Sequence, residues 1–233
     1  MSLTRSDARV ARDWRPMAFG PREPKHIHDP LCEPLWAGQR VLIAADARAV
    51  VIRDHEGTEL EGFEALREAI TAAHQAVELV VDGYLVRAPL HSSPGAENAP
   101  GADSVLTPAQ MTRQMFLGGG GRNERKEALE RAQARRVYLA PDDPTAFVAI
   151  DLVWLDGESL IDLPLLERKR LLESALADTE LVRRSVAVRP PVEAWYAQWK
   201  ALGFQEIAVK SANSRYTPGG VSNDWTTAPI PRR

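Results

Sequence analysis

Apolar residues alternate with polar ones in some parts of the chain and recur at helical spacing in others, which predicts a mixture of strands and helices. The segments predicted as strands, of which the first two form a hairpin, are 40–45, 48–53, 78–87, 147–154 and 206–211. The segments predicted as helices are 61–77, 164–176 and 192–202. We expect Gly203 to end the last helix and the Asp-Gly pair at 82–83 to interrupt the third strand.

These elements predict one domain that follows a short irregular segment. Residues 1–30 are polar and contain four prolines, whereas residues 31–230 hold the predicted strands and helices. An insertion at 91–135 begins with a stretch rich in Pro, Gly, Ala and Ser. Its glycine run at 118–121 lacks the Lys-Ser/Thr that completes a phosphate-binding loop, so a hinge is the favoured interpretation.

The composition is that of a globular protein with a full core, because 44% of the 233 residues are apolar and 26% are charged. No apolar run approaches the ~18 residues of a membrane span, and the N-terminus has no signal-peptide core. We therefore expect no membrane contact and a cytoplasmic location. The single cysteine, Cys32, excludes an internal disulfide and a cysteine-based metal cluster.

The formal net charge of −3 argues against a dedicated DNA-binding protein, because phosphate contacts need clustered Lys and Arg. The charge is unevenly distributed, since residues 183–233 contain eight basic and three acidic residues. This basic stretch either faces a polyanion such as DNA or is ordinary solvated surface.

The stretch Glu33-Pro-Leu-Trp-Ala-Gly-Gln-Arg40 precedes the predicted hairpin. It resembles the Glu-x-Lys-x-Asp-Gly-x-Arg motif of the ATP-dependent DNA ligases, whose lysine attacks the α-phosphate of ATP. The resemblance implies that Glu33 reads the adenine, that Gly38 shapes the turn and that Arg40 contacts the ribose. Leu35 stands in place of the lysine, and Ala37 in place of the aspartate.

Two further segments follow in the order of that family. Asp82-Gly83-Tyr84 resembles its Asp-Gly-Glu motif, with an aromatic residue in place of the glutamate. The predicted strand at 147–154 resembles the segment whose aromatic residue stacks on adenine. Ile150 stands at that aromatic position, which leaves Phe147 as the alternative stacking residue.

The last two segments carry the phosphate and metal contacts of the family. Glu206-Ile-Ala-Val-Lys210 resembles Glu-Gly-x-x-x-Lys, which implies a metal-binding role for Glu206 and a phosphate contact for Lys210. Residues 222–229 resemble Ser-x-Asp-Trp-x-Lys-x-Lys, but Thr227 and Pro229 replace the two lysines.

The resemblance covers residues 30–229 and implies an α+β fold, an ATP-grasp-like ligase adenylation domain. Such a domain has two antiparallel sheets around a nucleotide cleft, flanked by helices. The residues that it implies as cofactor-binding are Glu33, Leu35, Gly38, Arg40, Asp82, Phe147, Ile150, Glu206 and Lys210. We expect no OB domain, because the sequence stops where active ligases continue into one.

Leucine has no lone pair, so Leu35 excludes covalent catalysis at its position. The loss of two lysines removes positive charge that would stabilise a transferring phosphoryl group. We therefore expect a ligase-like protein of DNA repair and recombination that is catalytically inactive and acts by binding nucleotide, DNA or a partner. The expected ligands are weakly bound ATP or AMP, Mg²⁺ if a nucleotide is bound, and weakly and non-specifically bound DNA.

Two alternatives remain open. One is an active nucleotidyltransferase that uses a non-standard lysine, such as Lys210, among the five lysines of the chain. The other is a ligand-free structural subunit, with a repair-protein partner that supplies the missing OB domain. For Glu206 and Lys210, an internal ion pair on one strand face is the alternative to nucleotide binding.

Overall fold

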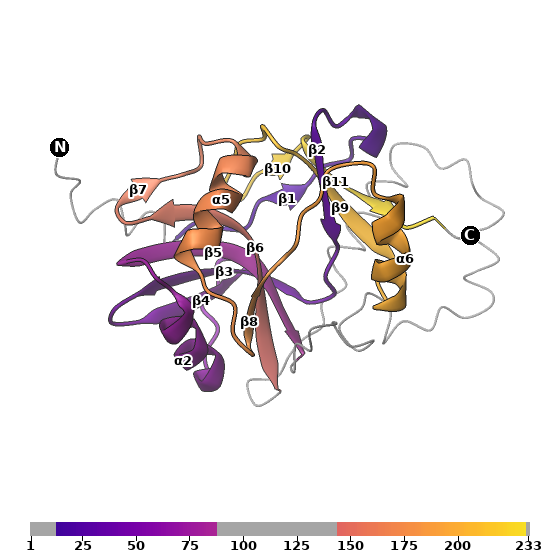
Figure 1. Cartoon of the computed structure of the whole chain (residues 1–233). Helices are drawn as coiled ribbons and strands as arrows, with labels where there is room; N and C mark the ends of the chain where they lie inside the picture. Colours follow the sequence, from indigo (N-terminus) through magenta and orange to yellow (C-terminus); the bar gives the residue numbers. More distant parts are fainter. Residues whose placement is uncertain (1–12, 88–143, 232–233) are drawn as a thin grey trace.

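The computed structural model describes residues 13–87 and 144–231, so the predicted insertion at 91–135 lies outside the described residues. The largest sheet consists of β3 (Gln39–Asp46), β4 (Val50–Asp54), β5 (Glu78–Arg87), β6 (Thr145–Leu155), β7 (Glu158–Ser159) and β8 (Val182–Arg184). Its strand order is β4-β3-β5-β6-β7 (Figure 1). The short strand β8 pairs in parallel with β6, and the other neighbours are antiparallel.

A second, smaller sheet is antiparallel and has the order β11-β9-β2. Its strands are β2 (Pro30–Pro34), β9 (Glu206–Ser211) and β11 (Trp225–Pro229). Two short strands, β1 (Ala18–Phe19) and β10 (Val221–Ser222), pair in parallel beside it. The helices are α2 (Glu64–Ala73), α5 (Leu165–Ala175) and α6 (Glu193–Ala201), with a 3₁₀ turn at Pro24–His26.

The two main sheets face each other across an inner core. Leu42 and Val148 of the large sheet and Ala208 and Trp225 of the small sheet are all buried in this cluster. A second cluster lies on the outer face of the large sheet, which α2 covers, and a third lies between the small sheet and α6. Both faces of β5 and β6 are therefore covered, which explains why their side chains are buried almost without interruption.

The N-terminal segment predicted as irregular contributes to this core within its described part. Met17 and Phe19 are buried in the inner cluster, although they precede the boundary predicted at residue 31. The prolines of the segment limit its regular structure to β1 and the 3₁₀ turn.

The expected interruption of the third strand at Asp82-Gly83 is wrong, because β5 continues through both residues. Only the register against β6 shifts at this point. A Cβ atom on Gly83 would lie 2.3 Å from the carbonyl oxygen of Val148, so glycine is required here by the close approach of β6 and not by a turn. The α+β class and the two facing sheets are confirmed.

Candidate functional site: an inter-sheet cluster of paired charges

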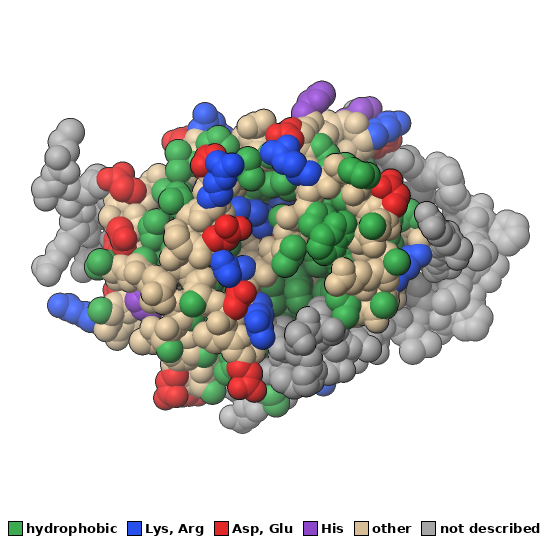
Figure 2. Space-filling model, viewed as in Figure 1, with side chains coloured by type: hydrophobic (Ala, Val, Ile, Leu, Met, Phe, Trp, Pro, Cys, Tyr) green, Lys and Arg blue, Asp and Glu red, His purple; other side chains and the backbone are tan. Residues whose placement is uncertain are grey.

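The residues of the ligase-like motifs gather where β2 and β9 of the small sheet face β3 and β5 of the large one. We call this region the inter-sheet site and define it by the residues Glu33, Leu35, Arg40, Asp82, Tyr84, Lys169 and Lys210. Figure 2 shows a recess on this face of the molecule, with Lys and Arg side chains inside it and apolar side chains gathered beside it.

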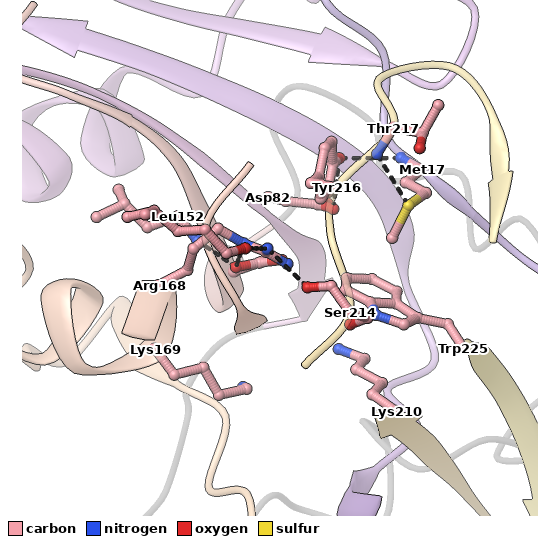
Figure 3. Close-up of polar contacts among 12 residues, drawn as sticks. Met17, Asp82, Leu152, Arg168, Lys169, Lys210, Ser214, Tyr216, Thr217 and Trp225 are labelled. Atoms are coloured by element: carbon pink, nitrogen blue, oxygen red, sulfur yellow. Dashed lines mark hydrogen bonds and ion pairs between the residues drawn. The ribbon is translucent and has the colours of Figure 1, made fainter. Parts of the chain in front are cut away.

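The carboxylate of Glu33 is the centre of the site, because two lysines share it. Lys169 Nζ of α5 donates to Glu33 Oε2 at 2.9 Å, and Lys210 Nζ of β9 forms a close ion pair with Glu33 Oε1. Figure 3 shows the two lysines extending from α5 and β9 toward the same region. The Lys210 contact lacks the geometry of a well-directed hydrogen bond, and the indole ring of Trp225 lies 4.2 Å from this ammonium group.

Burial and charge act in opposite directions on these groups. Burial by itself would raise the pKa of Glu33, but the charges of Lys169 and Lys210 outweigh it and lower this pKa to about 2. Burial lowers the pKa of Lys210 to about 8, because repulsion from Lys169 and Arg40 offsets part of the attraction by Glu33. The two lysines thus lower the pKa of Glu33, whereas burial is the main cause of the lowered pKa of Lys210.

A second group of paired charges lies next to the first. Arg40 donates two hydrogen bonds to Asp82, at 2.5 and 2.6 Å, and a third to the hydroxyl of Tyr84 at 3.0 Å. Tyr216 donates its hydroxyl to Asp82 at 2.8 Å and accepts the backbone N–H of Met17. Burial would lower the pKa of Arg40, but Asp82 raises it well above its ordinary value. The N–H groups of the Arg40 guanidinium thus donate hydrogen bonds to Asp82 and Tyr84.

Leu35 lies at the end of β2, where the ligase motif has its lysine. Its backbone N–H donates to the carbonyl oxygen of Glu206 at 3.1 Å, and its half-buried side chain packs against the inner core. The motif glycine, Gly38, has a structural reason to be glycine, because a Cβ atom there would lie 2.1 Å from the carbonyl oxygen of Leu85. The structure therefore brings Leu35, Glu206 and the Glu33–Lys210 pair into one part of the molecule, as the resemblance implied.

Phe147 does not face this site. It is buried in the outer cluster toward α2, whereas Ile150 faces the inner core. Side chains of a strand alternate between faces, so two residues three positions apart point to opposite sides. The prediction that Phe147 supplies the stacking aromatic ring is therefore wrong.

The metal role of Glu206 remains a prediction. The described residues contain no group of three or more His, Cys, Asp or Glu side chains that is arranged to hold a metal ion. Glu206 is half-buried at the start of β9, on the same strand face as Lys210. In the Glu-Gly-x-x-x-Lys motif the glutamate precedes the lysine by five positions, whereas Glu206 precedes Lys210 by four. The residue five positions before Lys210 is Gln205, which is exposed.

Sequence reasoning missed the polar residues of α5. Arg168 and Asp151 form a fully buried pair with two hydrogen bonds, at 2.9 and 2.7 Å (Figure 3). The next residue, Lys169, supplies the second cation on Glu33. The only signal in the sequence is that the run Glu-Arg-Lys-Arg at 167–170 lies within a helix that has buried apolar residues on one side.

Comparison with known proteins finds similar sequences among DNA ligases. The family model described as ATP dependent DNA ligase domain matches residues 117–227. A DNA ligase of Methanothrix thermoacetophila is 29% identical over 77% of this chain and 30% of its own length. The multifunctional non-homologous end joining protein LigD of Mycolicibacterium smegmatis is 28% identical over 82% of this chain and 20% of its own length. The chain thus spans less than a third of either relative.

Solved structures give the same assignment of fold. The ligase domain of LigD from M. tuberculosis superposes with a TM-score of 0.60 and 22% identity, over 94% of this chain and 60% of that domain. A mycobacterial DNA ligase D solved with ATP and MES has the same TM-score, at 21% identity and with coverage of 93% and 60%. The fold is that of a nucleotidyltransferase domain. In sequence and in fold the chain is similar to the adenylation domains of ATP-dependent DNA ligases.

In the described part of the chain, none of the helices has the length and apolar character needed to cross a membrane.

Proposed function

We propose that this protein is a catalytically silent adenylation domain that binds a nucleotide, ATP or AMP, without forming a covalent bond to it. Leu35 is the observation that carries the proposal, because it stands where the resemblance puts the nucleophilic lysine and has no lone pair. The polar groups that the resemblance assigns to adenine, ribose and phosphate are nevertheless present at the same place. These groups are Glu33, Arg40 and Lys210.

The residues present fit a nucleotide in chemical type. Glu33 offers a carboxylate acceptor, and Lys169 and Lys210 offer ammonium donors for an anion. Because these groups are already paired with each other, a nucleotide has to replace existing ion pairs, and we expect its binding to be weak. The context that we propose is DNA repair or recombination, to which the end-joining relative belongs by its name.

The test is incubation with ATP and Mg²⁺ or Mn²⁺, followed by mass measurement of the intact chain and by calorimetric titration with ATP and AMP. We expect no mass increase of one AMP and a measurable, reversible heat of binding. An acid-labile AMP adduct would refute the silent assignment. No binding of either nucleotide at millimolar concentration would refute the nucleotide-binding part. Arg48→Met is a matched control for later variants, because Arg48 is exposed at the tip of the β3–β4 hairpin.

One observation favours a second candidate, an active nucleotidyltransferase that uses Lys210. The pKa of Lys210 is lowered to about 8, and an amine that loses its proton near neutral pH is a better nucleophile than an ordinary lysine. Peptide mapping of any adduct separates the candidates. An adduct on Lys210 that is absent in Lys210→Met would establish this second function.

A further inference from the structure

The side chain of Arg168 joins three segments of the chain from a fully buried position on α5. Its Nε and Nη2 atoms donate to the carboxylate of Asp151 in β6, at 2.9 and 2.7 Å. Its Nη1 atom donates to two backbone carbonyl oxygens, that of Leu163 just before α5 and that of Ser214, the latter at 3.0 Å (Figure 3). Because Asp151 belongs to the large sheet and Ser214 follows the last strand residues of β9, Arg168 connects the helix with both sheets.

Ser214 is buried in the loop that follows β9, and its three polar groups have partners. Its N–H donates to the carbonyl oxygen of Ser211 at 3.0 Å, and its own carbonyl oxygen also accepts the N–H of Leu165 at 3.0 Å. Its hydroxyl accepts the indole N–H of Trp225 at 2.8 Å. A buried indole N–H needs such an acceptor, so the position of Ser214 determines where this N–H points.

Trp225 transmits the contact to Lys210. The two residues lie opposite each other in the register of β11 and β9, and the ammonium nitrogen of Lys210 lies 4.2 Å from the centre of the indole ring. Figure 3 shows the ring next to Ser214, with Lys210 extending toward it. An aromatic ring attracts a cation over its face, so a shift of the ring moves the favoured position of the ammonium group. The hydroxyl of Ser214 therefore acts on Lys210 through Trp225.

The same loop fixes the part of α5 that carries Lys169. Besides Ser214, which accepts the N–H of Leu165, Ala212 accepts the N–H of Leu166 at 2.9 Å. These two hydrogen bonds attach the first turn of α5 to the loop, and Lys169 lies about one helical turn after Leu165. Both lysines of the inter-sheet site are thus held by one loop.

The arrangement of the two lysines needs such support. A lysine side chain has many rotamers, and two ammonium groups on one carboxylate repel each other. We infer that Arg168 and Ser214 are positioning residues for the two lysines on Glu33, which they hold through the helix α5 and through the indole ring. The inference rests on the proposed function, because this arrangement is the one that a nucleotide meets.

The test removes the hydroxyl of Ser214 from the full chain. Variants of Arg168 or Asp151 leave a buried charge without its partner and can unfold the chain, so Ser214→Ala is used instead. Trp225→Phe removes the donor of the same hydrogen bond, and the double variant completes a cycle. The matched control is Ser185→Ala, because the hydroxyl of Ser185 accepts the indole N–H of a different tryptophan at 3.3 Å. Thermal unfolding of each variant verifies that it is folded.

The first measurement is calorimetric titration with ATP. We expect Ser214→Ala to weaken ATP binding about three- to tenfold, the usual effect of losing one hydrogen bond. It should have no further effect once Trp225→Phe has removed the donor, and Ser185→Ala should bind as the unmodified chain does. A purely structural hydrogen bond would lower the stability alone. Unchanged ATP affinity in Ser214→Ala, or an equal loss in Ser185→Ala, therefore overturns the inference.

The second measurement needs no ligand. The indole N–H signals of the six tryptophans are followed by NMR as the pH rises, and Trp225→Phe identifies the signal of Trp225. This signal should shift with a midpoint at about 8, the pKa of Lys210, and Lys210→Met should abolish the shift. In Ser214→Ala the freed ring lets water reach the ammonium group. The midpoint should then rise by about one pH unit, because burial is the main cause of the lowered pKa.

The pH titration separates position from charge. The charged groups that act on Lys210 are Glu33 of β2, Lys169 of α5 and Arg40 of β3, and the serine variants change none of them. A midpoint in Ser214→Ala that is unchanged or lower overturns the inference. An indole signal that does not titrate in the unmodified chain also overturns it.

The two measurements keep this inference apart from the proposed function. Failure of the unmodified chain to bind ATP or AMP at millimolar concentration refutes the proposed function, and the pH titration then decides the inference by itself. Nucleotide binding together with an unchanged midpoint in Ser214→Ala overturns the inference and leaves the proposed function intact.

Discussion

Replacement of Glu33 by Gln tests whether this carboxylate holds the inter-sheet site together. Glutamine keeps the size of the side chain and removes the negative charge that Lys169 and Lys210 share. Removal of one partner from a buried ion pair typically costs about 3–5 kcal/mol. The loss has a limit, because Lys210 can release its proton. With an ordinary lysine pKa of about 10.4, holding it neutral at pH 7 costs roughly 5 kcal/mol, at about 1.4 kcal/mol per pH unit.

The same reasoning predicts how the loss depends on pH. At about pH 9.5 deprotonation of Lys210 costs only about 1 kcal/mol, so Glu33→Gln should be less destabilising there than at pH 7. The folded-state pKa of Lys210, about 8, lies below its ordinary value. The unfolded chain therefore binds more protons between about pH 8 and pH 10.5, and the unmodified protein should gain stability from this group as the pH rises through that window.

Urea unfolding at both pH values measures the difference. The control is Glu167→Gln, which removes an exposed i,i+3 pair with Arg170 and should cost less than about 1 kcal/mol. A loss for Glu33→Gln below about 1 kcal/mol at pH 7 would refute the reasoning. So would a loss that is equal at the two pH values.

Four other predictions follow from the structure. Tyr216→Phe removes a buried hydroxyl that donates to Asp82, and it should lower the free energy of unfolding in urea by about 1–3 kcal/mol. An unchanged free energy of unfolding would show that this hydrogen bond does not stabilise the fold. Leu35→Lys alone should give no AMP adduct in intact-mass measurement, because the other substitutions of the motifs remain. ATP affinity should fall as the pH rises through about 8, since Lys210 loses its charge there, and a flat calorimetric profile would contradict this. Duplex DNA should bind no tighter than the ~10⁻⁴–10⁻⁶ M of non-specific binding at physiological salt, and nanomolar nick binding would be evidence for end recognition.

We expect weak DNA binding because of where the charges of residues 183–233 lie. Four of these basic residues pair with acidic residues from earlier in the chain, Arg184 with Asp178, Arg189 with Asp29, Lys210 with Glu33, and Arg215 with Asp162. Half of the eight basic residues of this stretch are thus paired within the fold. Few of its charges remain to release counterions from a duplex.

The secondary-structure elements that the sequence predicted correctly are those determined by residues close to them in the chain. The β3–β4 hairpin, the start of α5 after Pro164 and the end of α6 before Gly203 depend on periodicity and on capping residues within a few positions. The gathering of Glu33, Arg40 and Lys210 followed from the order of the motifs. These features needed no knowledge of distant contacts.

The features that sequence reasoning missed depend on contacts between distant segments. Lys169 and Glu33 are 136 positions apart, and a lysine on an amphipathic helix is ordinarily a surface residue. The interpretation of Asp82-Gly83 as a strand break failed because the requirement for glycine comes from β6, across the sheet. Phe147 was assigned to the site by its chemical type, although its strand position turns it toward α2.

The retained motif residues have a structural role that does not need a ligand. Glu33 connects β2 to α5 and β9, and Arg40 connects β3 to Asp82 of β5. Loss of either would leave a buried charge without a partner, so these residues stabilise the fold even where the nucleophile is absent. Their presence is therefore weak evidence for nucleotide binding. Titration with ATP and AMP, and not the presence of these residues, therefore decides whether the site binds a nucleotide.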